Sequence, residues 1–223
     1  MIRARSELLR LAEHYARRAQ ELNPTNPALP VVSDSQLAET LALRAMQSRD
    51  PAARAGLLRQ RLELLEKSYS NISPDDHAHA RELLDLARAR ADADEMVRAA
   101  ELARALLRLA PQIEQDPTTR GLYDEVRHHA HLIVGRSALR MGNLTTASQE
   151  LLAAGKVAGG GTLSSFGPNM TLAKELLEKG ARDVVIEYLE ECRIFWTRGR
   201  NLDPWIATIR KGGIPQFGAN LIY

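Results

Sequence analysis

The stretch Leu132–Ala154, LIVGRSALRMGNLTTASQELLAA, contains short side chains at the positions where two antiparallel helices must pack closely. Gly135 and Ala138 lie on a first predicted helix, Gly142-Asn143 forms a turn, and Ala147 lies on the contact face of a second predicted helix. Helix axes approach to about 8–10 Å only where the side chains between them are small. The stretch therefore predicts one helical hairpin.

The composition extends this prediction to the rest of the chain. Aromatic residues make up only 4% of the 223 residues, whereas Ala, Leu, Arg and Glu, which favour helices, are abundant. No run of alternating Val, Ile and Thr predicts a strand. We therefore predict an all-α protein.

Arrays of helical hairpins are typically recognised by a sequence period of about 34 residues, and further helix pairs are predicted along this chain. The N-terminal segment reads as the second helix of a pair, with Ala12, Ala16, Ala19 and Pro24 in the repeat spacing. Complete hairpins are predicted at 33–69, with a turn at Asp50-Pro51; from Ser73-Pro74 to Pro111, with small residues at Ala87, Ala99 and Ala103; at 119–157; and at 168–197, with Ala173 at the contact and Gly180 at the turn. The glycine-rich segment 155–170 is predicted to be a loop.

This pattern resembles that of tetratricopeptide repeat proteins, whose second helices carry alanines at spacings of four and three residues. The resemblance covers residues 76–198 well and residues 1–70 loosely. It implies an α-solenoid of antiparallel helical hairpins in a single domain, 1–223. Residues 1–70 would form degenerate N-terminal hairpins, residues 73–157 the clearest repeats, and residues 168–223 the final hairpin with a capping tail.

The C-terminal block is rich in aromatic residues. Ten residues of the chain are aromatic, and seven of them follow residue 165. A solenoid needs a special end unit to cover its last apolar face, so we predict a cap. Trp205 and Ile206 would lie on a short helix that begins at Asp203-Pro204, and the tail GGIPQFGANLIY would fold back across the final hairpin.

Two other interpretations of this block are open. Phe166, Trp196 and Phe217 could instead line a small-molecule or peptide pocket. The block also resembles the C-terminal end of uncharacterised bacterial tetratricopeptide-like proteins, some of them associated with sigma-70-type transcription factors.

The sequence contains no strong signature of catalysis or of a cofactor. The segment GKVAGGGT lacks the preceding strand and the Gly-Lys-Ser/Thr ending of a phosphate-binding loop. Cys192 is predicted to be a small buried hydrophobic residue. His128 and His131 share a helix face near Asp124 and Glu125, but we predict packing or hydrogen bonding there and no metal. We predict that the protein is not an enzyme.

Charge and hydropathy limit the partners. The formal charge of +2 does not favour nucleic acid as a partner. No segment approaches the roughly 18 apolar residues of a membrane span, and the N-terminus reads as an amphipathic helix without the apolar core of a signal peptide. The single cysteine forms no internal disulfide. We therefore predict a cytoplasmic protein with no membrane partner, while a removed export signal stays an alternative.

Basic residues follow the small contact position on each predicted first helix. In a curved array these positions line the concave side. A guanidinium there is suited to binding a carboxylate, so the expected ligand is an acidic peptide or a free C-terminus. The alternative is an ordinary solvated row of basic residues. The groove residues we predict are Arg44, Arg81, Arg88, His129, Arg136, Arg140 and Lys174.

Together these features predict a non-catalytic scaffold or adaptor that binds a peptide segment or partner protein in a basic concave groove. The alternative is a ligand-sensing or transcription-associated regulatory module that uses the aromatic C-terminal block. No motif identifies the partner, the pathway or the oligomeric state.

Overall fold

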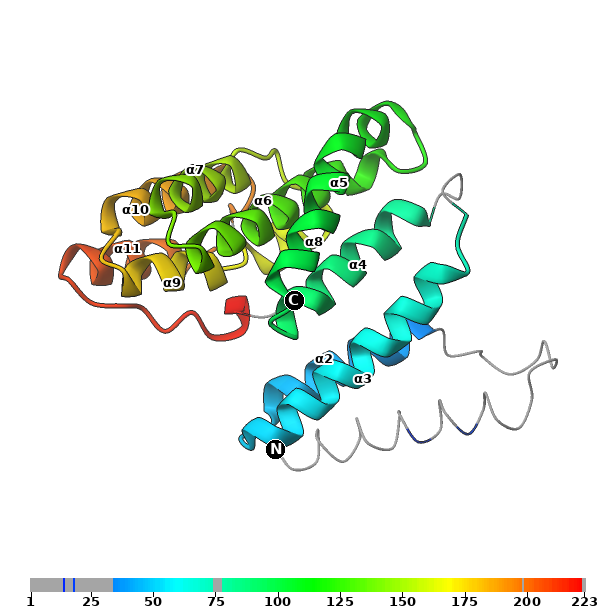
Figure 1. The fold of residues 1–223 in the computed structure, drawn as a ribbon. Coiled ribbons are helices and arrows are strands. Elements are labelled where there is room, and N and C mark those ends of the chain that lie inside the picture. Colours follow the sequence, from blue (N-terminus) through cyan, green and yellow to red (C-terminus); the bar gives the residue numbers. More distant parts are fainter. Residues whose placement is uncertain (1–13, 15–17, 19–33, 74–77, 198, 222–223) are drawn as a thin grey trace. The chain divides into compact units, whose positions relative to one another are not determined.

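The computed structural model describes residues 14, 18, 34–73, 78–197 and 199–221 (Figure 1). All regular elements in these ranges are α-helices or 3-10 helices, and the described residues contain no strand, so the predicted all-α class is confirmed for them. The chain divides into two compact units, Met1–Pro74 and Asp75–Tyr223. Some residues of the predicted repeat pattern lie outside the described residues: Ala12, Ala16, Ala19, Pro24 and Pro74.

Within residues 34–73, the first unit forms a helical hairpin of α2 (Asp34–Gln47) and α3 (Pro51–Ser70). The predicted break at Asp50-Pro51 is confirmed: Asp50 caps α3, its Oδ1 accepting the N–H of Ala52 at 3.0 Å and its Oδ2 the N–H of Ala53 at 3.3 Å. Pro51 is tolerated as the first helical residue because its missing N–H would have no intrahelical partner there. Buried leucines, including Leu41 and Leu65, join the two helices.

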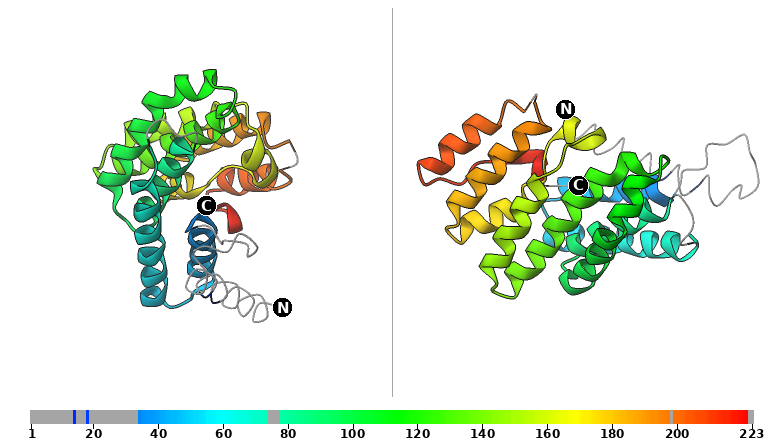
Figure 2. Two further views of the ribbon diagram at one scale, coloured as in Figure 1. Left: turned by 90° about the vertical axis from the view of Figure 1, so that its right-hand side faces the viewer. Right: turned by 90° about the horizontal axis from the view of Figure 1, so that it is seen from above.

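The second unit contains three hairpins followed by a C-terminal helix (Figures 1 and 2). Each hairpin has a first and a second helix, and a short helix α8 lies before the third hairpin. The helices are α4 (His79–Asp92), α5 (Met96–Gln115), α6 (Tyr123–Arg140), α7 (Leu144–Gly155), α8 (Gly161–Phe166), α9 (Thr171–Glu178), α10 (Arg182–Glu191) and α11 (Leu202–Arg210).

The turns of the second and third hairpins lie where the sequence predicts them. Gly142 follows α6 with φ +77°, and Gly180 follows α9 with φ +83°. This left-handed backbone region favours glycine because a side chain there is strained. Asn143 then caps α7, its Oδ1 accepting the N–H of Thr146 at 3.0 Å.

The predicted close approach at Gly135 is confirmed. A Cβ atom added there would overlap Cδ2 of Leu172 on α9 and would lie 3.0 Å from Cβ of Glu150 on α7. Leu172 is fully buried, so a side chain at residue 135 has no free space to enter. Gly135 therefore lets α6 pack against both the second helix of its own hairpin and the first helix of the next.

Two local expectations need correction. Segment 155–170 is not a loop throughout, because α8 forms within it; Leu163 of α8 is fully buried, and Gly160 N–H donates to Ser164 Oγ at 2.9 Å. The helix α5 also continues past Pro111 to Gln115. Pro111 is exposed, and a proline in a helix costs a hydrogen bond without forbidding further turns.

The C-terminal tail returns to the start of α9, as the cap prediction requires. The backbone N–H of Met170 donates to the carbonyl of Asn220 at 2.7 Å, and Asn220 Nδ2 donates to the carbonyls of Phe166 and Pro168, each at 3.0 Å. Phe217 is buried against Trp205 of α11, with ring centroids 5.0 Å apart. The tail thus covers apolar side chains at this end of the unit. In the described ranges, no helix has the length and apolar character needed to cross a membrane.

Candidate functional site

The candidate site in the second unit lies on the first helices of its three hairpins. α4 contacts α6, and α6 in turn contacts α9, so these helices follow one another side by side. They carry six of the seven predicted groove residues: Arg81, Arg88, His129, Arg136, Arg140 and Lys174. Arg44 lies on α2 in the first unit, where it is half-buried.

Arg136 joins α6 to α9 through a carboxylate. Its Nη2 lies 3.1 Å from Oε1 of Glu175, and its Nε donates to the same oxygen at 3.2 Å. Only 14% of the Arg136 side chain and 22% of the Glu175 side chain are exposed. This shielded pair is therefore part of the packing between the two helices, and it holds the guanidinium in one orientation.

Arg140 lies one helical turn farther along α6 and is more exposed. Its Nη2 lies 3.1 Å from Oδ1 of Asp94, in the turn between α4 and α5, and 3.9 Å from Oε1 of Glu175. The exposed fractions of the Arg140 and Asp94 side chains are 54% and 74%. We call Asp94, Arg136, Arg140 and Glu175 the α6 charge cluster.

The other predicted cations in this unit also have acidic partners. Arg81 of α4 contacts both oxygens of Glu125 on α6, at 3.1 and 3.4 Å. Within single helices, Arg88 pairs with Asp85 at 3.2 Å and Lys174 with Glu178 at 3.0 Å. The face thus carries alternating charges rather than only positive ones. Sequence reasoning missed these carboxylates, although the spacings of three and four residues at Asp85 and Glu178 are the usual signal for helical ion pairs.

His129 of α6 lies in the interior of the unit. It is only 3% exposed, and burial lowers its pKa well below the usual value for histidine. The nearby positive charge of Arg88 lowers the pKa further. The ring is therefore neutral at physiological pH.

His128 joins three segments of the second unit. Its ring is fully buried; Nδ1 lies 2.9 Å from the carbonyl oxygen of Ala154 on α7, and Nε2 lies 3.2 Å from the backbone nitrogen of Asn169. Since a carbonyl only accepts and an amide N–H only donates, Nδ1 carries the proton and Nε2 accepts. Tyr188 Oη donates to the carbonyl of Asn169 at 3.0 Å. A neutral histidine thus satisfies both backbone groups.

Acidification should destabilise the second unit through His128. Burial lowers its pKa from 6.5 to about 4, so its contribution to stability is complete above about pH 6.5 and is lost as the pH falls towards 4. We expect His128 to account for about 2 kcal/mol of the loss in the free energy of unfolding between pH 7 and pH 5, and the buried His129, whose pKa is also lowered, to add to this loss. Urea unfolding followed by tryptophan fluorescence measures it, because both tryptophans of the chain, Trp196 and Trp205, lie in this unit.

The variant His128→Asn is the control for this pH effect. An asparagine amide can donate to the Ala154 carbonyl but does not titrate between pH 7 and pH 5. It should be less stable than the wild type at pH 7 and should lose less stability on acidification. The same loss in both proteins would show that His128 is not the titrating group.

The third histidine of the cluster faces a carboxylate. His131 Nδ1 lies 2.7 Å from Oε2 of Glu150 on α7, and both side chains are half-buried. Across the ranges that the structure describes, no group of three or more His, Cys, Asp or Glu side chains is placed to hold a metal ion. Cys192 is buried as predicted, and burial raises the pKa of its thiol.

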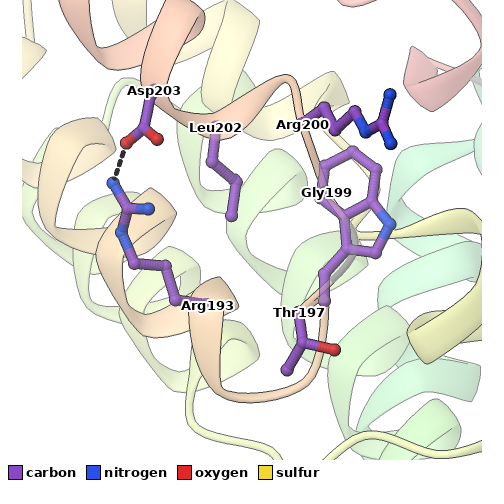
Figure 3. A pocket seen from close by; sticks show the side chains of 7 residues that line it. Arg193, Thr197, Gly199, Arg200, Leu202 and Asp203 are labelled. Atoms are coloured by element: carbon purple, nitrogen blue, oxygen red, sulfur yellow. Dashed lines mark hydrogen bonds and ion pairs between the residues drawn. The ribbon is translucent and has the colours of Figure 1, made fainter.

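The structure brings together only two of the three aromatic residues predicted to form a pocket. Trp196 and Phe217 are buried and each packs against Trp205, with centroid distances of 5.7 Å from Trp196 to Trp205 and 5.0 Å from Trp205 to Phe217. Phe166 is 69% exposed. Trp196 does line a pocket, but with a different set of residues that includes Arg193 and Arg200 (Figure 3).

No protein-family model matches the chain, and neither a curated protein nor a solved structure is significantly similar to it.

Proposed function

We propose that this chain is a non-catalytic interaction scaffold of the tetratricopeptide-like type, which binds a peptide segment of a partner protein. The observation that carries the proposal is the order of contacts in the second unit. α6 contacts α4 and α5 of the preceding hairpin, α7 of its own hairpin and α9 of the next. Packing of each hairpin on its sequence neighbours is the arrangement by which solenoids form extended binding surfaces.

The small residue at Gly135 supports this arrangement. Contact of α6 with Leu172 across successive hairpins requires that residue 135 have no side chain. The same steric requirement explains why small residues stand at the helix contact positions, which is the pattern that resembles tetratricopeptide repeats. We infer an α-solenoid in which α4, α6 and α9 form the binding face.

Arg140 is the residue that we expect to bind the partner. Its pair with Asp94 is exposed, and exposed ion pairs contribute only about 0–1 kcal/mol. A carboxylate of a partner can therefore replace Asp94 at little cost to the fold. Arg136 is shielded and already bonded to Glu175, so we assign it to orienting the α6 charge cluster rather than to direct binding. The ligand that fits is an acidic peptide or a C-terminal carboxylate.

Affinity purification from cells of the native organism, followed by titration with the purified partner segment, tests this proposal. We expect Arg140→Glu to weaken binding at least about tenfold, the size of a lost charged hydrogen bond, and higher salt to weaken wild-type binding by screening. Arg104→Glu, an equal charge reversal at an exposed residue of the second helix α5, should leave binding unchanged. Equal affinity of the Arg140→Glu and wild-type proteins would refute the assigned face.

A further inference from the structure

Four helices of the second unit end with the same backbone geometry, in which a residue with positive φ follows the helix. After α6, Gly142 has φ +77°, and the N–H of Asn143 donates to the carbonyl of Ala138 at 2.9 Å. The same combination of features follows α4, α9 and α11, and it is a common way for a helix to end at a glycine. The residues with positive φ are Gly142, Gly180 and Gly212 after α6, α9 and α11, and Asp94, with φ +64°, after α4.

Asp94 is the exception among these four positions. In the ranges that the structure describes, it is also the one non-glycine residue with positive φ. A side chain strains this backbone region, and aspartate tolerates it because its carboxylate can bond to the nearby backbone. Here, however, the carboxylate accepts a hydrogen bond from Nη2 of Arg140, 46 residues farther along the chain, at 3.1 Å. The turn itself therefore does not explain why aspartate stands where glycine would fit without strain.

The Asp94–Arg140 pair contributes little to the stability of the fold. The side chains are 74% and 54% exposed, and water screens ion pairs that are exposed to this extent. The larger effect of the pair is on Arg140 itself. Oδ1 of Asp94 is bonded to Nη2, the same guanidinium nitrogen that lies 3.9 Å from Oε1 of Glu175. A carboxylate from another molecule must therefore displace Asp94 before it can bond to Nη2.

We propose that Asp94 is an internal competitor for the carboxylate-binding position of Arg140, and that it sets which acidic ligands bind there. Asp94 bonds to the guanidinium through one oxygen. A carboxylate that bonds to two guanidinium nitrogens forms one more charged hydrogen bond than Asp94 does, so it can displace Asp94. This inference rests on the proposed function, because it concerns the same binding residue, and it adds that the position is occupied from within when no partner is bound.

Fluorescence anisotropy of the full chain with fluorescein-labelled hexaglutamate, at low ionic strength, tests the inference. The variant Asp94→Asn removes the competing charge, and Asp94→Gly also removes the backbone strain. We expect each of them to raise the affinity for this peptide about three- to tenfold, the size of a lost exposed ion pair together with the repulsion between two carboxylates.

Two comparisons separate competition at Arg140 from a general change in charge. Asp203→Asn is the matched control, because Asp203 is also an exposed aspartate paired with an arginine, Arg193, but lies on α11. It should change the affinity less than about twofold, since salt screens distant charges. In the Arg140→Gln background, Asp94→Asn should also have less than about a twofold effect, because the group for which Asp94 competes is gone.

Circular dichroism checks that each variant folds. The inference is overturned if Asp94→Asn binds the peptide no more tightly than the wild type, if Asp203→Asn gains as much as Asp94→Asn, or if the gain persists in the Arg140→Gln background. No gain from Asp94→Asn, where Arg140→Gln does weaken binding, refutes the competition alone. Equal binding by the wild type and Arg140→Gln, or no binding by either, refutes Arg140 as the carboxylate-binding residue as well.

Discussion

Gly135→Val is expected to lower the free energy of unfolding of the second unit by about 3 kcal/mol, at the upper end of the usual cost of overpacking a core. The added Cβ alone overlaps Cδ2 of Leu172, lies 3.0 Å from Cβ of Glu150 and lies 3.4 Å from the carbonyl oxygen of Ala147. Valine places two further carbons in the same space. Because Leu172 is fully buried, α6 and α9 must move apart to accept them.

Urea unfolding followed by tryptophan fluorescence measures this loss in the second unit. The control is Gly121→Val in the same unit, because nothing lies within 4 Å of a Cβ added at Gly121. We expect the control to change stability by less than about 0.5 kcal/mol, as for most surface substitutions. A cost below about 1 kcal/mol for Gly135→Val would contradict the close packing that underlies the scaffold proposal.

His128→Ala is expected to lower the free energy of unfolding of the second unit by about 4 kcal/mol, slightly more than Gly135→Val. Two losses combine: the carbonyl of Ala154 and the N–H of Asn169 lose their buried partner, and a cavity replaces the imidazole. Each unsatisfied buried backbone group costs about 1–3 kcal/mol. Hydrogen exchange should also show faster exchange of the Asn169 amide, since its hydrogen bond is removed directly.

His131→Ala provides the comparison for this variant. His131 is on the same helix, but it is half-buried and its Nδ1 is bonded to a side chain, that of Glu150, and not to the backbone. Its removal should cost about 1 kcal/mol or less. If His131→Ala destabilised the unit as much as His128→Ala, the assigned role of His128 in joining α6, α7 and the segment before α9 would be wrong.

The hairpins of the described residues could be predicted because their signals are local. Asp50-Pro51 begins α3 through a cap and a proline that act within one turn of the chain. Gly142 and Gly180 mark turns through their own backbone geometry. The close approach at Gly135 could also be predicted, because a glycine inside a helical pattern often indicates close packing against another helix.

The helix α8 shows where local signals fail. Gly159 and Gly160 precede it and Gly161 is its first residue, and three successive glycines predict a loop. Six residues are too few for a helix to be stable by intrinsic propensity. The burial of Leu163 and the hydrogen bond from Gly160 to Ser164 stabilise it, and burial is a tertiary property.

The positions of the basic residues in the candidate site could be predicted from the sequence, but the acidic partners on other helices could not. The row of basic residues follows from helical spacing, whereas Arg81 pairs with Glu125 across 44 residues and Arg136 with Glu175 across 39. No periodicity in the sequence relates residues that far apart. The three clustered histidines could likewise be found by spacing, but only packing decides that His128 and His129 are buried while His131 contacts Glu150.

The sequence by itself therefore determined the paired helices of the hairpins, their turns and the close approach at Gly135, because steric and hydrogen-bonding requirements within a few residues specify them. The tertiary structure alone decided two things: which carboxylates on other helices pair with the basic row, and which atoms join the tail to the start of α9. Each depends on distances between segments remote in sequence. Such distances arise only when buried side chains pack, and for this reason they leave no local pattern.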